Sequence, residues 1–333
     1  MEIIILIFSL GVILFGAEVF TNGIEWLGKK LNLSEGTVGS VLAAVGTALP
    51  ETMIPVIAIL FGTGDEASHI GIGAILGAPF MLATLALGVV GIAGTLFKVG
   101  GKRREHMLIN EGVMRRDLLF FLIVFSIAIA AAFMPPGFKQ VIVFGLVAAY
   151  VVYVYLTVKD DTKADTDAEL HPLKFAKKST DPSLGIILLQ AAFALGIIVL
   201  GAHLFVDSIK YLSQVIGLPA FVLSIIIAPV ATELPEKFNS LIWIRKGKDT
   251  LALGNITGAM VFQSSLIPAL GIAFTPWELS TLAVVSAVLA LLSAAIVYGT
   301  LYFKRSISPK TLIGVSSLYF VFIIAVVLTG GGH

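Results

Sequence analysis

The fold is decided by a stretch that the chain carries twice. Residues 11–51 read GVILFGAEVFTNGIEWLGKKLNLSEGTVGSVLAAVGTALPE, and residues 196–236 read GIIVLGAHLFVDSIKYLSQVIGLPAFVLSIIIAPVATELPE. At a shift of 185 positions the two stretches align without a gap and share fourteen identical residues. Apolar composition alone explains repeated Leu and Ile. It does not explain a shared Thr-x-Leu-Pro-Glu, which ends at Glu51 and again at Glu236. The repeat therefore predicts two homologous halves.

The composition around the repeat is that of a membrane protein. Of the 333 residues, 57% are hydrophobic and 13% charged, and the mean hydropathy is +1.00. A soluble chain carries roughly 25% charged residues. Apolar stretches of about 20 residues, the length that crosses a hydrocarbon core of about 30 Å, recur along the chain. We predict an all-α, polytopic membrane protein with about ten transmembrane helices, at 2–24, 36–61, 68–97, 117–134, 139–157, 184–211, 218–244, 250–274, 279–303 and 310–330.

Each half is predicted to hold five of these spans. Residues 1–158 form the first repeat, 159–183 a flexible cytoplasmic linker, and 184–333 the second repeat. An odd number of spans means that the second half enters the membrane from the opposite side. Such inverted-topology repeats are typical of secondary transporters, which bind their substrates where the halves meet near the middle of the membrane.

The basic residues predict the orientation. All but three of the 22 Lys and Arg lie in the odd-numbered loops; the exceptions are Lys139, Lys210 and Lys237. Because basic loops stay in the cytoplasm, both termini are predicted to be extracytoplasmic, in a multi-pass protein of the cell membrane. The first apolar stretch lacks a basic leader and is predicted to be a retained helix rather than a signal peptide. The basic run 102–116 is interpreted as an orienting charge run that faces anionic lipid.

Several functions are excluded or disfavoured by composition. The net charge of +1 leaves no basic face for nucleic acid. The chain has no Cys, hence no disulfide and no thiolate metal site. Motifs of intramembrane or soluble hydrolases do not occur, so an enzyme is not expected. No cofactor is predicted. The expected partners are inorganic cations and the lipid bilayer, and the oligomeric state is left open, a monomer included.

The candidate site is formed by the two acids that end the repeat. Glu51 and Glu236 each follow a proline inside a predicted span. An ionisable group at that depth costs several kcal/mol unless it is paired, and the proline loosens the helix beside it. Thr47 and Thr232 lie four residues earlier, on the same helix face as the acids. This all-oxygen set suits hard cations such as Ca²⁺, Na⁺ or Mg²⁺. The alternative is a pair of buried acids held protonated for packing.

Further polar residues are predicted near the site. Glu233 and Lys237 are four residues apart, a spacing that favours an ion pair on one helix face. The pair is either structural or functional. In the functional case, Lys237 occupies a cation position, or Glu233 binds an ion or a proton. Gln263 is predicted to be an ion ligand, the alternative being an interhelical hydrogen bond. Lys237, Ala48 and Asn255 are candidate site-modulating residues.

These motifs resemble those of the cation/calcium exchanger superfamily, which includes the sodium/calcium exchangers. The likeness is carried by Gly46-Thr-Ala-Leu-Pro-Glu51 with the run Gly73–Gly77, and by Ala231-Thr-Glu-Leu-Pro-Glu236 with Gly254-Asn-Ile-Thr-Gly258. They look like the family's two alpha-repeats, at about 36–97 and 218–274. The resemblance implies that Glu51 and Glu236 are the central metal-binding acids and that Thr47 and Thr232 add oxygen atoms. It implies antiport of a divalent cation, Ca²⁺ first, against Na⁺ or H⁺ by alternating access.

The chain departs from the family pattern at several positions. Ala or Glu replaces the family's serines, and Leu or Gln its Asn or Asp; the positions are Ala48, Glu233, Ala78, Ala259, Leu82 and Gln263. Two alternatives therefore stay open. One is a proton-coupled exchanger, or an exchanger of another divalent ion such as Mg²⁺, with a remodelled site. The other is a non-transporting cation sensor or scaffold whose site is locked by Lys237.

Overall fold

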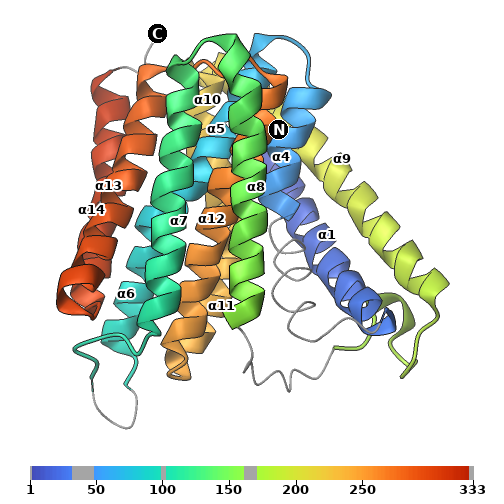
Figure 1. Ribbon diagram of the computed structural model, residues 1–333. Helices are drawn as coiled ribbons and strands as arrows, with labels where there is room; N and C mark the ends of the chain where they lie inside the picture. The colour runs from blue at the N-terminus through green and yellow to red at the C-terminus, as the bar shows by residue number, and fades with distance from the viewer. Residues whose placement is uncertain (1, 32–48, 99–102, 161–170, 330–333) are drawn as a thin grey trace.

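The computed structural model describes residues 2–31, 49–98, 103–160 and 171–329, and every regular element in these ranges is a helix. This confirms the predicted all-α class. The main helices are α1 (Glu2–Lys30), α4 (Leu49–Leu60), α5 (Asp65–Met81), α6 (Leu87–Leu96), α7 (Glu111–Ala130), α8 (Pro136–Asp160), α9 (Leu184–Ile216), α10 (Ala220–Thr232), α11 (Leu234–Arg245), α12 (Asp249–Phe274), α13 (Thr281–Lys304) and α14 (Pro309–Leu328). Figure 1 shows them as one bundle.

Eight helical segments of the described chain are long and apolar enough to cross a membrane. One of them, from Asp65 to Leu96, consists of α5, a π-helix at Leu82–Ala86 (η2) and α6. The other two predicted spans hold shorter apolar helices. The described part of span 36–61 is α4, and span 218–244 is divided into α10 and α11 at Glu233. The chain is a multi-pass membrane protein with about ten spans, as predicted.

Three helices extend by at least five residues past the predicted ends of their spans. α1 continues to Lys30, α7 begins at Glu111, and α9 continues to Ile216. Hydropathy marks only the apolar part of a helix, whereas backbone hydrogen bonding continues through polar turns. The start of α7 is fixed by Asn110, whose side-chain oxygen accepts the backbone N–H of Gly112 at 2.9 Å, as is usual for a residue that caps a helix.

Helices that the repeat makes equivalent are buried to similar degrees. The two central ones are the α5–α6 span, whose apolar window is 83% buried, and α12, whose window is 67% buried. At the periphery, the corresponding values are 11% for α8 and 28% for α14. Each half therefore contributes one helix to the centre of the bundle and one to its lipid-facing rim.

The contacts between α1 and α9 at Gly16 and Gly201 are reciprocal: a contact made by a residue of the first half is also made by its equivalent in the second half. A Cβ atom built on Gly16 would lie 2.7 Å from Cγ1 of Ile198, and one built on Gly201 would lie 2.7 Å from Cγ1 of Ile13. Both pairs of equivalent positions are separated by the same shift of 185 residues. Reciprocal contact of this kind is the signature of a two-fold axis, and it supports the inverted repeat.

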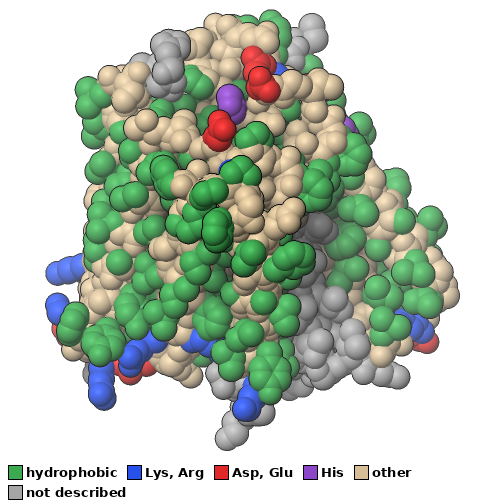
Figure 2. Space-filling view, turned by 45° about the horizontal axis from the view of Figure 1, so that its top comes forward, with side chains coloured by type: hydrophobic (Ala, Val, Ile, Leu, Met, Phe, Trp, Pro, Cys, Tyr) green, Lys and Arg blue, Asp and Glu red, His purple; other side chains and the backbone are tan. Residues whose placement is uncertain are grey.

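The start of α1 and the end of α14 lie at one end of the bundle in Figure 1. The described parts of the α6–α7 and α8–α9 connections lie at the other end. Figure 2 shows hydrophobic side chains over most of the visible face, with Lys and Arg gathered towards its lower edge. This arrangement agrees with the predicted orientation. Which end faces the cytoplasm stays a prediction.

Candidate functional site

The first-half acid is buried inside the bundle. Glu51 lies in the first turn of α4 and is 4% exposed. α4, the helix that carries this acid, packs against α5, α9 and α12. A carboxyl group in this position needs a cation, a proton or hydrogen-bond donors to be tolerated within a membrane.

The second-half acid occupies the same place in the equivalent helix. Glu236 is the third residue of α11 (Leu234–Arg245), just as Glu51 is the third residue of α4 (Leu49–Leu60). The side chain of Glu236 lies outside the described residues, and so do Thr47 and Ala48. The distance between the two carboxyl groups, and the part of these residues in one site, stay predictions.

The helix is interrupted directly before the second acid. Glu233 has the dihedral angles φ −89° and ψ 9° and separates α10 from α11. The hydroxyl of Thr232, the last residue of α10, is fully buried and donates to the carbonyl of Ala228 at 2.9 Å. The same hydroxyl oxygen can still accept a hydrogen bond or bind a cation through its lone pairs. The negative end of α10 and the positive end of α11 thus meet inside the bundle, an arrangement that transporters use to bind ions of either sign.

Gln263 of α12 brings an amide group into the bundle core. The residue is 0% exposed, and neither its oxygen nor its nitrogen has a hydrogen-bond partner among the described residues. A buried amide left in this state costs about 1–3 kcal/mol. The two serines that follow are occupied, because Ser264 and Ser265 donate to the carbonyl of Val261 at 3.2 and 2.6 Å. The Gln263 oxygen is therefore well suited to be a cation ligand.

Asn255 lies at a different level of the membrane from Gln263. Both belong to α12 and are eight residues apart, which corresponds to about 12 Å along the helix axis. Asn255 is partly exposed, whereas Gln263 is fully buried. Contact of both residues with one bound ion is not compatible with this spacing, so a modulating effect of Asn255 would have to be indirect.

Glu233 and Lys237 form the predicted ion pair. The Lys237 Nζ atom lies 3.6 Å from Oε2 of Glu233, and the two side chains are 13% and 0% exposed. The same Nζ lies 3.0 Å from Sδ of Met81 in α5 and 3.5 Å from the carbonyl oxygen of Pro229 in α10. The ammonium group is therefore enclosed by both halves of the chain, beside the break between α10 and α11.

A π-helix interrupts the central span of the first half. In η2 (Leu82–Ala86) the carbonyl of Ala83 accepts the hydroxyl of Ser293 from α13, and Thr84 donates to the carbonyl of Phe80 at 2.6 Å. π-Helices often mark functional sites. This element is not predicted by the hydropathy pattern. Its one local signal is Pro79, which lacks the N–H that a regular helix needs at that position.

A buried carboxylate in α7 was also missed. Asp117 accepts the hydroxyl of Thr257 at 2.8 Å, hydrogen-bonds the Tyr153 hydroxyl and pairs with Arg116 at 3.3 Å. Thr257 belongs to the glycine-flanked motif of α12, so this cluster ties that motif to α7 and α8. Burial of a charge pair is tolerable only with such additional hydrogen bonds.

The predicted lipid-facing charge run is wrong for two of its arginines. The Arg116 side chain is 14% exposed and that of Arg104 is 3% exposed. Arg104 donates to the carbonyl of Ile244 at 2.5 Å and lies 3.4 Å from the fully buried carboxylate of Asp249. Arg104 is held inside the bundle by an acid far away in the sequence. Arg116 pairs with the adjacent Asp117, and its guanidinium lies 5.6 Å from the centre of the Tyr153 ring of α8.

The described half of the linker is not a free chain. Within 159–183, the segment 171–183 packs on α1 and α9. The indole nitrogen of Trp26 donates to the carbonyl of His171 at 2.9 Å, and Leu173 is fully buried beside Trp26. The expectation of a flexible linker is therefore wrong for this half, because Leu173 packs against Trp26 of α1 and Ile187 of α9.

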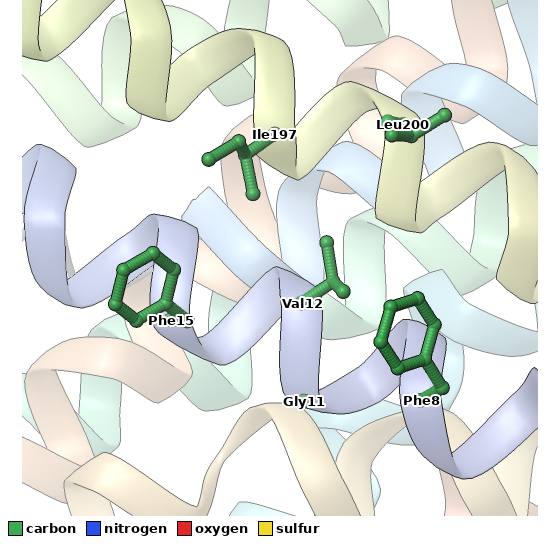
Figure 3. A pocket seen from close by; sticks show the side chains of 6 residues that line it. All are labelled: Phe8, Gly11, Val12, Phe15, Ile197 and Leu200. Atoms are coloured by element: carbon green, nitrogen blue, oxygen red, sulfur yellow. The ribbon is translucent and has the colours of Figure 1, made fainter.

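A surface hollow of about 460 Å³ has a lining that does not suit an ion. It lies between α1 and α9, and Figure 3 shows the side chains that line it. They offer no side-chain oxygen to a cation: Phe8, Gly11, Val12, Phe15, Ile197 and Leu200. Apolar lining of this kind on a transmembrane surface suits lipid chains.

Among curated relatives, the similarity extends over most of the chain. The inner membrane protein YrbG of Escherichia coli is 23% identical over 313 residues, which cover 93% of this chain and 91% of YrbG. The sodium/calcium exchanger MaX1 of Methanosarcina acetivorans is 24% identical over 299 residues, which cover 82% of this chain and 83% of MaX1.

Solved structures share the fold. The crystal structure of the H⁺/Ca²⁺ exchanger CAX matches with a TM-score of 0.75 and 17% identity, over 98% of this chain and 82% of CAX. The sodium-calcium exchanger NCX_Mj matches with a TM-score of 0.59 and 20% identity, over 97% of each chain. The family model described as sodium/calcium exchanger protein matches residues 1–159 and 186–328. The chain therefore belongs to the sodium/calcium exchanger protein family, whose members are transporters and not enzymes.

Proposed function

We propose that this protein is a secondary active antiporter that exchanges Ca²⁺ for Na⁺ or H⁺ by alternating access. Glu51 and Glu236 hold the transported ions in the middle of the membrane. One observation carries the proposal: in an exchanger-family chain, the repeat places these acids as the third residue of two equivalent helices, α4 and α11.

The proposed ligands are all oxygen atoms. They are the carboxylates of Glu51 and Glu236, the hydroxyls of Thr47 and Thr232, and the side-chain oxygen of Gln263. Ca²⁺ takes about six to eight oxygen ligands, and backbone carbonyls at the break between α10 and α11 would complete the set. The burial of Glu51, Thr232 and Gln263 supports this assignment, because bulk water does not reach these side chains and a bound cation would interact with their oxygen atoms instead.

Two facing carboxylates give exchange its physical basis. Both cannot stay ionised in a buried site unless a cation or a proton neutralises them. A carrier emptied of its ion would have to move uncompensated charge through the hydrocarbon layer, which is costly. Transit is therefore restricted to carriers that hold either the divalent ion or the coupling ion.

The coupling ion is Na⁺ or H⁺. MaX1 is named a sodium/calcium exchanger, and the solved CAX structure is that of an H⁺/Ca²⁺ exchanger, so both ions have precedent in this fold. Ala78 and Ala259 lack the hydroxyl groups that would serve as extra Na⁺ ligands. A proton needs no shell of ligands, so this loss favours H⁺ of the two. Mg²⁺ is the alternative divalent substrate.

The outer helices α1 and α9 are proposed to move during the cycle. Their 29 and 33 residues correspond to lengths of about 44 and 50 Å, well beyond the 30 Å hydrocarbon core. Both run obliquely to the bundle in Figure 1. They pack in a smaller core cluster with α4, α10 and part of α5. Sliding of α1 and α9 would open the site to one side of the membrane and then to the other. The two halves of the protein are residues 1–158 and 184–333, and both termini are proposed to be extracytoplasmic.

The test is uptake of radiolabelled Ca²⁺ into proteoliposomes under an imposed Na⁺ gradient and, separately, an H⁺ gradient. Glu51→Gln and Glu236→Gln are each expected to lower uptake about tenfold or more, since each removes a charged ligand worth at least about 1.4 kcal/mol. The matched control is Glu278→Gln, an exposed glutamate in the connection between α12 and α13. It should leave uptake unchanged.

Each result has a clear meaning. Uptake with only one of the gradients identifies the coupling ion. Uptake of Mg²⁺ without uptake of Ca²⁺ would show that Mg²⁺ is the transported divalent ion. Normal flux in both acid variants would reject the proposed site. Absence of flux under every gradient, together with thermal stability that no cation changes, would favour a sensor or scaffold instead.

A further inference from the structure

We propose that the ammonium group of Lys237 is a built-in counter-cation that fills one cation position beside the exchange site. In each transport cycle the protein would then carry one coupling ion fewer than it would carry without the lysine. This inference rests on the proposed function and specifies its stoichiometry.

The pair that Lys237 forms with Glu233 is present in one half of the chain only. At the shift of 185 residues, Glu233 corresponds to Ala48 and Lys237 to Thr52. At these two aligned positions the second half therefore carries one negative and one positive charge that the first half lacks. Glu233 alone would need an additional cation from solution. Lys237 supplies that charge from within the chain.

The surroundings of the ammonium are those of a cation position. Nζ has Oε2 of Glu233 at 3.6 Å and the carbonyl oxygen of Pro229 at 3.5 Å, with Sδ of Met81 at 3.0 Å. The carbonyl belongs to the last turn of α10, where the helix dipole favours positive charge. The Glu233 side chain is 0% exposed, so water cannot stabilise its charge in place of the lysine.

The position lies next to the candidate site. Lys237 directly follows Glu236 in the first turn of α11, and Met81 directly precedes Leu82, the repeat equivalent of Gln263. On the α14 side, Tyr319 lies within electrostatic range of Glu233. The carboxylate of Glu233 and the ammonium of Lys237 therefore lie in the same region in which the transported ions are proposed to bind.

A purely structural ion pair makes a different prediction. Removing the positive member of a structural pair destabilises the protein, because the acid stays buried and loses its ammonium partner. It does not change how many ions cross per cycle. Removing a built-in counter-cation creates a carboxylate site that a Na⁺ or H⁺ from solution must fill in every cycle.

The experiment compares four proteins in liposomes clamped at zero membrane potential: wild type, Lys237→Gln, Lys237→Arg, and the double variant Glu233→Gln/Lys237→Gln. The equilibrium accumulation of Ca²⁺ is measured under a tenfold gradient of whichever coupling ion drives the wild type. One additional coupling ion per cycle raises the accumulation about tenfold in Lys237→Gln. Lys237→Arg keeps the charge and the double variant removes the acid, so both should match the wild type.

A second readout does not need flux. In detergent, Na⁺ or H⁺ should raise the unfolding temperature of Lys237→Gln by more than that of the other three proteins, because only this variant has gained a cation site. Equal accumulation in Lys237→Gln and wild type, with no gain in cation-dependent stability, would overturn the inference while leaving the proposed function intact. A wild type without exchange would reject the proposed function, and the inference with it.

A variant that does not fold leaves the question decidable. If Lys237→Gln cannot be purified, Glu233→Gln is used, in which the ammonium has lost its acid but stays beside the site. Repulsion is then expected to raise the apparent KM for Ca²⁺ about tenfold or more relative to wild type, and the double variant should restore it. A wild-type KM in Glu233→Gln would contradict the inference.

Discussion

Replacing Gly16 in α1 by alanine would press a methyl group into α9. The new Cβ would lie 2.7 Å from Cγ1 of Ile198 and 3.2 Å from the carbonyl oxygen of Ala194. Carbon atoms pack best at about 3.5–4.0 Å, so the first contact is too short by about 0.8 Å. One of these contacts is to backbone, so rotation of the isoleucine side chain alone does not relieve the strain. The two helices would have to separate.

The expected cost follows from two opposing effects. Overpacking of this kind destabilises by about 1–3 kcal/mol, and alanine recovers about 1 kcal/mol of helix propensity relative to glycine. The equivalent variant Gly201→Ala should cost the same, because its Cβ meets Cγ1 of Ile13 at 2.7 Å and the carbonyl oxygen of Ser9 at 3.1 Å. The double variant should cost less than the sum, since one separation of the helices relieves both contacts.

The same two helices offer matched controls. Gly11 and Gly196 are equivalent in the repeat, and a Cβ on either would meet nothing within 4 Å. Alanine at these positions should be neutral or stabilising by up to about 1 kcal/mol. The assay is thermal unfolding of purified protein in detergent. The contact variants should unfold about 1–4 °C below their controls, from the usual entropy of unfolding per residue. A loss at Gly16 without a similar loss at Gly201 would refute the two-fold interface.

Three further variants test buried polar contacts. Asp117→Ala should destabilise by about 3–5 kcal/mol, because Arg116 and the two hydroxyls would lose their buried acceptor; an unchanged unfolding temperature would show that the cluster is open to water. Arg104→Met should lower the unfolding temperature as well, and the second change Asp249→Asn should recover part of the loss, whereas simple additivity would contradict the pairing. Ser293→Ala should cost about 1–3 kcal/mol, since it strips the π-helix carbonyl of its donor, and no change in stability would show that the carbonyl finds another partner.

The fold could be predicted from the sequence because its signals are local or repeated. Spans are set by apolar length, and the inverted architecture follows from a repeat that ends in a proline-acid pair in each half. The ion pair of Glu233 with Lys237 was also predictable, because its members are one helical turn apart on the same face. The spans and the ion pair can each be read within about forty residues, and the repeat requires only a comparison of the chain with itself.

The features that were missed depend on distant partners. Asp117 contacts Thr257, which is 140 residues away in the sequence, and a basic run beside it is equally compatible with a lipid-facing surface. The π-helix after Met81 is stabilised by a hydroxyl from α13, 210 residues away. The described part of the linker is held on α1 and α9 by one fully buried leucine and by hydrogen bonds to side chains of both helices. In the sequence, one leucine does not distinguish such a segment from a mobile polar one.

The central claim is that Glu51 and Glu236 meet around one transported cation. Its most direct test is a crystal structure grown with Ca²⁺, with anomalous data collected at a wavelength long enough to locate calcium. The account predicts a peak with carboxylate oxygens of both glutamates at about 2.3–2.6 Å, the usual range for calcium ligands. A calcium peak elsewhere in the bundle, or two glutamate side chains that point away from each other, would contradict it.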